Sequence, residues 1–227
     1  MSAAQQSRTS QSTRRTQSSE QAAGTREEIL EAAQEFLWTR PFREMTIRSL
    51  MAETTVSRPA FYQYFEDVHE LMETLLESLA DEILSVAEPW LVSTGDPVGP
   101  LRESLDGLVR ICYRRGPILR ASSDAATSDS RMESAWTGFL KGFDDVVASR
   151  IEADQAQGLI PSFDAQPIAV ALNRLDAYTF IDAFGTRPRR RPEPVLDAIS
   201  RLWISSLYGT KRLEGASSDL VRCRTKQ

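Results

Sequence analysis

The chain has 227 residues, 41% of them hydrophobic, which is enough to bury a core in one domain or in a small head and a larger body. Its formal net charge is -5, yet residues 1–65 hold eight Arg and seven Glu, a balance of +1 that leaves -6 for the remainder. This distribution permits nucleic-acid contact near the N-terminus. Two distant cysteines, Cys112 and Cys223, exclude a disulfide framework and a zinc site, and no apolar run is long enough to cross a bilayer.

The N-terminal segment predicts a polar arm. Residues 1–24 are low in complexity, with fourteen Ser, Thr or Gln, and their basic residues are Arg8, Arg14 and Arg15. Such a segment cannot offset its ordering entropy by burial, so we expect residues 1–24 to be disordered. Two interpretations stay open, a solvated tail and a basic arm that follows DNA into a neighbouring groove. Because no signal-peptide core is present, we predict a cytoplasmic protein.

Helical periodicity begins at Thr25, which is predicted to form an N-cap box with Glu28. The first helix carries an apolar stripe and ends at Pro41; the stripe is formed by Ile29, Ala32, Ala33, Phe36 and Leu37. A second, short helix is predicted to start at the N-cap Thr46 and to stop near Glu53.

A third helix is predicted to open at the N-cap Ser57, with Pro59 tolerated in its first turn. Two short helices joined by a few residues and braced by a preceding helix are the parts of a helix-turn-helix. On a helical wheel, Phe61 and Phe65 share the stripe that faces the core. The residues around them face outward and form the candidate DNA surface: Arg58, Ala60, Tyr62, Gln63 and Tyr64.

The residue types on this surface match the chemistry of DNA. Exposed tyrosine hydroxyls donate to phosphate oxygens, and their rings pack against sugar. Arg58 suits guanine edges or phosphate, and Gln63 suits adenine. Thr46 lies at a helix N-terminus, so its hydroxyl and backbone N–H are predicted to form a second phosphate-binding site. The alternative interpretation is a generic helical pair with surface aromatics.

The remainder of the chain predicts a helical body. Asp67 is expected to cap a long helix that fades at Pro89, and the later helices are separated by the loop 93–100, by Gly116-Pro117 and by the run 185–194. Those later helices are expected at about 101–114, 117–126, 131–157, 165–184 and 193–208. No alternating strand pattern occurs, so the predicted fold class is all-α with about nine helices. The predicted domains are an arm over 1–24, a helix-turn-helix domain over 25–66, a ligand-binding and dimerisation domain over 67–210 and a flexible tail over 211–227.

The stretch TIRSLMAETTVSRPAFYQYF, residues 46–65, resembles the DNA-binding head of TetR-type repressors, and the match extends over about residues 25–72. The resemblance implies a three-helix head followed by a six-helix body that binds a ligand and dimerises. It also implies that Thr46, Tyr62 and Tyr64 hold phosphates. The full DNA-binding set expected from the motif is Thr46, Ser57, Arg58, Ala60, Tyr62, Gln63 and Tyr64.

Two positions depart from the family pattern. Thr55 stands before Val56 where the family usually has Gly, so we expect a less permissive turn geometry. Val68 stands where the family commonly has Lys at the start of the fourth helix. One phosphate contact is therefore expected to be missing, which would weaken DNA binding or reduce its salt dependence.

The body carries a candidate ligand pocket. The motif SRPxFYxYF together with the segment Trp203–Gly209 resembles the mycobacterial repressor of ethionamide activation and related actinobacterial regulators, which implies an apolar tunnel lined by aromatics and an Asn. The expected lining is Leu101, Leu105, Leu108, Cys112, Trp136, Phe139, Leu140, Phe143, Asn173, Asp176, Phe180 and Trp203. Asn173 and Asp176, one turn apart, suit the polar group of a ligand in an apolar pocket. The alternatives are that these aromatics are ordinary core and that Asn173 meets its symmetry mate in a dimer.

The resemblance implies a homodimer through the predicted helices eight and nine, 165–184 and 193–208. Glu66 and His69 spell Glu-x-x-His, but a di-iron bundle needs two such pairs and His69 is the only histidine. We therefore predict no enzyme, no cofactor and no metal site. The predicted function is a ligand-responsive repressor that binds a near-palindromic operator as a dimer and is released by a small apolar effector. The alternative is a helical adaptor without sequence-specific DNA binding.

Overall fold

The computed structural model describes residues 23–209, so residues 1–22 of the predicted arm and the whole predicted tail over 211–227 lie outside the described residues. The last two residues of the predicted arm, 23 and 24, are helical, so the arm was predicted to end too late. Within 23–209 the chain forms eight α-helices and no strand, which confirms the all-α prediction with one helix fewer than expected. The described chain divides into two compact units between Met72 and Glu73. No helix in this part of the chain is long and apolar enough to cross a membrane.

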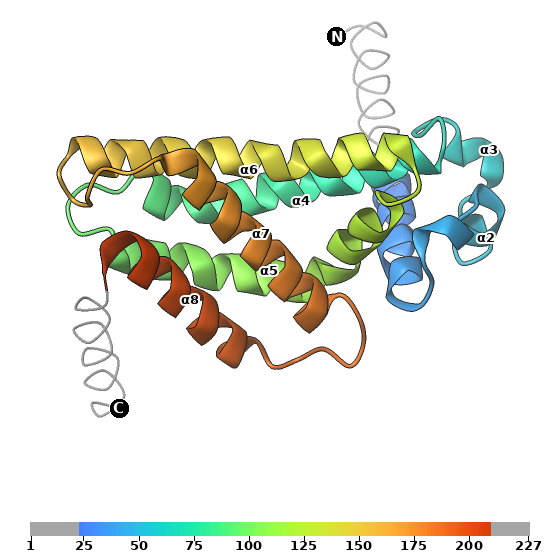
Figure 1. The fold of residues 1–227 in the computed structure, drawn as a ribbon. Coiled ribbons are helices and arrows are strands. Elements are labelled where there is room, and N and C mark those ends of the chain that lie inside the picture. The colour runs from blue at the N-terminus through green and yellow to red at the C-terminus, as the bar shows by residue number, and fades with distance from the viewer. Residues whose placement is uncertain (1–22, 210–227) are drawn as a thin grey trace, which may run out of the picture. The chain divides into compact units, whose positions relative to one another are not determined.

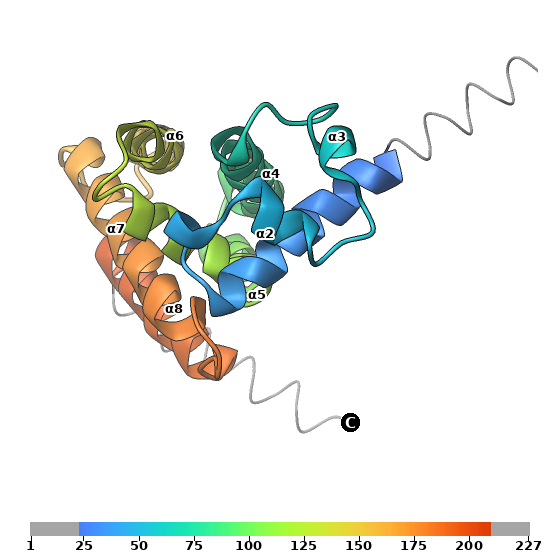
Figure 2. The same cartoon turned by 90° about the vertical axis from the view of Figure 1, so that its right-hand side faces the viewer.

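The N-terminal unit contains the first helix over 23–39, the 3-10 turn η1 (Phe42–Glu44), α2 (Ile47–Met51) and α3 (Arg58–Phe61), as Figures 1 and 2 show. Its core is formed by fully or almost fully buried apolar side chains from all of these elements: Ile29, Ala33, Phe36, Leu37, Phe42, Leu50, Phe61 and Phe65. Burying this set holds the short helices in place, because helices of four and five residues are unstable alone.

The start of the first helix differs from the prediction. The described helix already includes residues 23 and 24, so Thr25 lies inside it and is not its N-cap. The other predicted caps are confirmed. The side chains of Thr46 and Ser57 each accept a hydrogen bond from the backbone N–H three residues later. Asp67 Oδ1 accepts from the backbone N–H groups of His69 and Glu70.

Five long helices follow: α4 (Val68–Leu91), α5 (Val98–Ala125), α6 (Ser130–Ala156), α7 (Ala165–Phe184) and α8 (Pro192–Tyr208). Within the second unit, α5 packs against α6, α7 and α8, and α7 also packs against α6 (Figure 1). The core therefore lies around α5. Among its largest fully buried side chains are Leu75, Leu79, Leu101, Phe180 and Phe184.

The predicted break at Gly116-Pro117 is wrong, because α5 continues through both residues. Proline has no N–H to donate to the carbonyl four residues earlier, which is that of Tyr113. Arg189 supplies the missing donor: its Nη1 donates to Tyr113 O at 2.6 Å, and its guanidinium lies 3.8 Å from the centre of the Tyr113 ring. A distant loop thus satisfies the carbonyl that the proline leaves open. The helix α4 similarly runs two residues beyond Pro89.

Candidate functional site

The short helix α3 presents polar side chains on its outer face. Ser57 Oγ accepts from the N–H of Ala60 at 3.4 Å, and Phe61 below is fully buried. The helix ends at Phe61, earlier than the helical wheel through Phe65 assumed, so Tyr62 caps it and Gln63 lies in the turn that follows. Arg58 and Gln63 are exposed, and Tyr62 is 56% exposed with its ring perpendicular to that of Phe61. The exposed tyrosine, glutamine and arginine flank the buried Phe61. They form a surface that can bind a partner without rearrangement of the core.

The remaining predicted DNA-binding residues are less open. Ala60 and Tyr64 are half-buried. Thr46 is exposed, but its N–H donates to Ser49 Oγ at 2.9 Å and its Oγ1 accepts from Ser49 N at 3.0 Å. The N–H and the hydroxyl of Thr46, which were expected to bind a phosphate, are thus both engaged in a capping box. A phosphate at Thr46 would compete with Ser49.

The turn between α2 and α3 is anchored by an acidic residue of the first helix. Glu28 Oε1 accepts from Thr55 Oγ1 at 2.7 Å and from Thr55 N at 2.8 Å. These hydrogen bonds hold the pKa of the Glu28 carboxyl below its ordinary value, the side-chain bond contributing most. No non-glycine residue of the described chain has a positive φ, so Thr55 takes an ordinary backbone conformation. The pair Thr55–Glu28 fixes the turn where glycine was expected.

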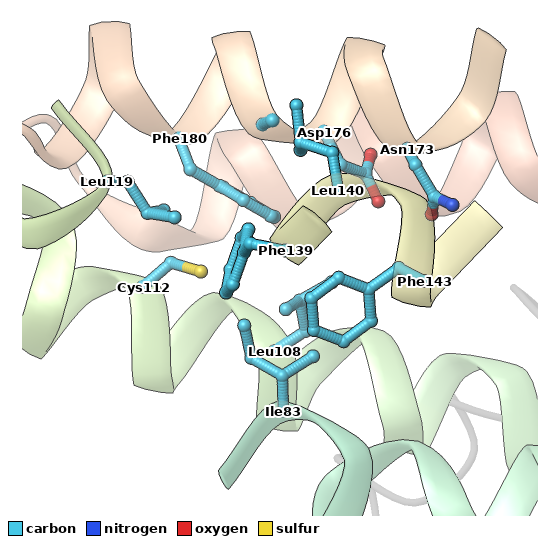
Figure 3. Close-up of a pocket in the computed structure, with 11 residues that line it drawn as sticks. Ile83, Leu108, Cys112, Leu119, Phe139, Leu140, Phe143, Asn173, Asp176 and Phe180 are labelled. Carbon is cyan, nitrogen blue, oxygen red and sulfur yellow. The ribbon is translucent and has the colours of Figure 1, made fainter. Parts of the chain in front are cut away.

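The body holds a cavity of about 60 Å³ between α4, α5, α6 and α7, drawn in Figure 3. Eight of the predicted pocket residues line it: Leu108, Cys112, Phe139, Leu140, Phe143, Asn173, Asp176 and Phe180. Three lining residues were missed: Ile83, Leu119 and Ala177. Ile83 lies on the apolar stripe of α4, and Leu119 lies just beyond the wrongly predicted break, so periodicity across Pro117 was the signal for it.

Four residues of the expected pocket lie outside its lining. Leu101 and Leu105 are buried at 1% and 3% exposure, in the core of α5. Trp136 stacks on Phe139 with ring centres 5.5 Å apart, and Trp203 packs edge-on against Trp90. Trp136 therefore supports a lining residue from behind, and the others are core residues, as one of the alternatives for this set supposed.

A second hollow adjoins Phe139. It is a groove of about 360 Å³ between α4 and α6, and Phe139 belongs to the lining of both spaces. The other groove residues are Glu73, Leu76, Glu77, Ala80, Ser134, Ala135 and Gly138. Phe139 is the residue that the two linings share.

The two polar residues of the cavity are held in different ways. Asn173 Nδ2 donates to Asp144 Oδ1 at 2.9 Å, and Arg174 binds both oxygens of the same buried carboxylate. Asp176 is 5% exposed, and its Oδ2 accepts from Trp203 Nε1 at 3.0 Å. Asp176 Oδ1 makes no hydrogen bond within the described residues. One buried acceptor is therefore open on the cavity side of α7.

Burial raises the pKa of Asp176 from 3.8 to about 7, against the opposing hydrogen bond from Trp203. In the unfolded chain the carboxyl loses its proton near pH 4, whereas in the folded chain it keeps the proton up to about pH 7. The contribution of Asp176 to the free energy of unfolding is therefore intact below about pH 4 and falls as the pH rises to about 7.

We expect Asp176→Asn to gain stability relative to the wild type as the pH rises. Because the variant has no carboxyl to ionise, the difference in free energy of unfolding should move in its favour by about 2 kcal/mol between pH 5 and pH 8. Urea unfolding of both proteins at the two pH values measures this difference. A difference that does not change with pH would contradict the assignment of a raised pKa to Asp176.

Comparison with known proteins adds to this geometry. Residues 29–75 match the family model for bacterial regulatory proteins of the tetR family, and residues 101–209 match the model for the C-terminal domain of the transcriptional regulator EthR. The chain is similar to the HTH-type transcriptional regulator EthR of Mycolicibacterium smegmatis, with 28% identity over 189 residues that cover 80% of this chain and 85% of the relative.

Solved structures share the fold at lower identity. The regulatory protein TetR from Rhodobacter sphaeroides aligns with a TM-score of 0.64 and 18% identity, covering 80% of this chain and 97% of that one. The SmeT–triclosan complex aligns with a TM-score of 0.65 and 17% identity, covering 82% and 92%. The order and packing of the helices is therefore one that these proteins also adopt.

Proposed function

The chain belongs to the TetR family of bacterial transcriptional regulators, close to the EthR group, and on this premise we propose that it is a dimeric repressor released from its operator by a small apolar effector. The observation that carries the proposal is the outward surface of α3 and of the turn that follows it. It combines exposed Arg58, Tyr62 and Gln63 with a motif that matches the family's DNA-binding model.

The roles on this face follow from chemistry and exposure. Tyr62 donates its hydroxyl to a phosphate oxygen, and Arg58 reaches phosphate or a guanine edge. Gln63 pairs with adenine in the major groove. The half-buried Ala60 and Tyr64 and the cap residues Thr46 and Ser57 are proposed to complete the DNA contact set. Val68, half-buried at the start of α4, offers no cation to the backbone.

Dimerisation is proposed through α7 and α8. These helices carry two of the large apolar side chains that the body leaves exposed, Tyr178 at 62% and Leu202 at 43%. Exposed apolar side chains on neighbouring helices are typical of an interface between copies of a chain. A two-fold axis would then place two copies of α3 in successive major grooves, about 34–36 Å apart on a near-palindrome.

The effector site is proposed to be the cavity around Phe139. Its lining is apolar apart from Asn173 and Asp176, which matches the usual composition of small-molecule pockets. The SmeT–triclosan complex shows that a protein of this fold can be solved with a small molecule bound. A cavity of about 60 Å³ is far below the few hundred Å³ of a typical ligand site, so an effector must move the Phe139 ring toward the adjacent groove.

This displacement supplies the mechanism. An effector that binds the widened cavity stabilises a body conformation that differs from the one described. If that conformation spreads the two heads beyond the groove spacing, DNA affinity falls by the differential binding of the effector, typically about 1–3 kcal/mol of coupling. Release therefore requires no chemistry, and blocking a promoter requires only binding.

The proposal predicts different outcomes for two neighbouring residues. Tyr62→Phe should weaken binding about fivefold on every DNA sequence, because one hydrogen bond to phosphate is lost. Gln63→Ala should lose about tenfold on the operator and little on random DNA, because the residue reads a base. Fluorescence anisotropy with DNA from upstream of the protein's own gene, against a scrambled duplex, measures both effects across a salt series.

The control is Gln157→Ala, an exposed glutamine at the C-terminal end of α6, which should bind DNA as the wild type does. Equal losses on both duplexes for Gln63→Ala would remove it from the base-reading set. A wild-type affinity that is the same on both duplexes, with a flat dependence on salt, would instead favour the adaptor function.

A further inference from the structure

The cavity contains a buried carboxyl oxygen without a hydrogen-bond donor among the residues that the structure describes, and it belongs to Asp176. Asp176 is 5% exposed, and only its Oδ2 has a hydrogen-bond donor, the Trp203 indole, within the described chain. Figure 3 shows Asp176 reaching from α7 toward the space bounded by Leu140 and Phe143. A buried carboxylate oxygen without a donor is costly, so a ligand that brings a donor gains the interaction that the protein omits.

The surroundings restrict what that ligand can be. The eleven lining residues include no Lys, Arg or His, so nothing in the lining attracts an anion. The nearest basic side chain on the same helix, Arg174, forms an ion pair with Asp144. Three aromatic rings face the same space, those of Phe139, Phe143 and Phe180. The faces of these rings attract a cation and also pack against an apolar body.

We propose that the effector is an apolar amine, whose protonated nitrogen donates a hydrogen bond to Asp176 Oδ1 while its hydrocarbon or aromatic body fills the space of the displaced Phe139 ring. This assignment rests on the proposed role of the cavity as the effector site. A charge-assisted hydrogen bond in an apolar site is stronger than a neutral one, and it needs a cation rather than a neutral donor for full effect.

The ionisation of the site agrees with this chemistry. Burial raises the pKa of Asp176 to about 7, so an amine that binds the carboxylate also draws the remaining proton off it. The other titratable side chains nearest the cavity do not compete for the cation. Cys112 stays a thiol because burial raises its pKa; Glu82 on α4 pairs with Arg115, and Asp144 on α6 pairs with Arg174. The packed face of α8 contributes the Trp203 donor.

The test compares two probes of nearly equal shape, phenylbutylamine and phenylbutanol, by isothermal titration calorimetry of the full chain at pH 8. The wild type should bind the amine more tightly than the alcohol, by about tenfold or more. Asp176→Asn should lose that preference while keeping its affinity for the alcohol. Asp182→Asn, an exposed acidic residue on the same helix, should keep the wild-type preference.

The same titrations in Phe139→Ala test whether the small size of the cavity limits binding. Phe139 belongs to the linings of both the cavity and the groove, so truncating its side chain should enlarge the space that a probe can enter. Equal affinities for amine and alcohol, or an amine preference that survives Asp176→Asn, would overturn the proposal. So would the failure of both probes to bind Phe139→Ala. Operator binding is measured separately, so a regulator released by neutral apolar molecules would keep the proposed function while the amine assignment fails.

Discussion

Asp154→Ala should destabilise the protein by about 3–5 kcal/mol, because it leaves a buried guanidinium without its counter-charge. Arg150 and Asp154 lie one turn apart on α6, with side chains 5% and 1% exposed and Nη2 2.8 Å from Oδ1. That contact is a close ion pair without hydrogen-bond geometry. The free energy of unfolding, measured in urea at a fixed protein concentration, reports the loss.

The cost is high because the pair belongs to a buried network. Arg150 Nη1 donates to the carbonyls of Leu91 and Ser93 at 3.1 and 2.9 Å, and Tyr208 donates to Asp154 Oδ2 at 2.6 Å. Burial, followed by the hydrogen bond to Asp154, raises the pKa of the Tyr208 hydroxyl well above its ordinary value. The network joins α6 to the C-terminal end of α8 and to the end of α4, so its loss affects three elements.

A matched control lies on the same helix. Lys141 and Asp145 form an ion pair at the same i, i+4 spacing, but their side chains are 67% and 52% exposed. Asp145→Ala should therefore leave the free energy of unfolding nearly unchanged, because solvent screens an exposed pair. Similar losses for the two variants would show that burial does not decide the strength of the Arg150–Asp154 pair.

Gly116→Ala should destabilise the body by about 3 kcal/mol, because a methyl group at this position meets the backbone of α7. A Cβ on Gly116 would lie 2.3 Å from Phe184 O and 2.6 Å from Phe184 C. Backbone atoms cannot move aside as a flexible side chain can, so α5 and α7 must separate. Phe184 stacks on Phe180, which lines the cavity, and the separation should therefore also weaken effector binding.

Gly142→Ala on α6 is the control for this substitution. A Cβ there has nothing within 4 Å, and the position is helical and exposed. Alanine is a better helix former than glycine, so the variant should gain up to about 1 kcal/mol. Thermal and urea unfolding of the two variants should shift in opposite directions. Equal shifts would contradict the close approach of α5 and α7 at Gly116.

Local sequence patterns determined two helix caps and the buried face of the N-terminal unit. The caps at Thr46 and Ser57, the buried Phe61 and the exposed Tyr62 follow from side-chain chemistry and helical period within a few residues. Such short-range rules act before any distant contact forms. The same rules failed at Thr25, because the segment before it continues the helix.

Distant contacts decided the rest. A proline after glycine reads as a helix end, yet α5 passes through Pro117 because Arg189, far along the chain, donates to the carbonyl that the proline leaves open. The helical pattern also placed Asn173 and Asp176 on one face. Only the tertiary structure shows that Asn173 donates to Asp144 and that Asp176 Oδ1, beside the cavity, has no hydrogen-bond donor within the described chain. Periodicity specifies which side of a helix is buried, whereas the partner of a buried polar group depends on which other helix packs there.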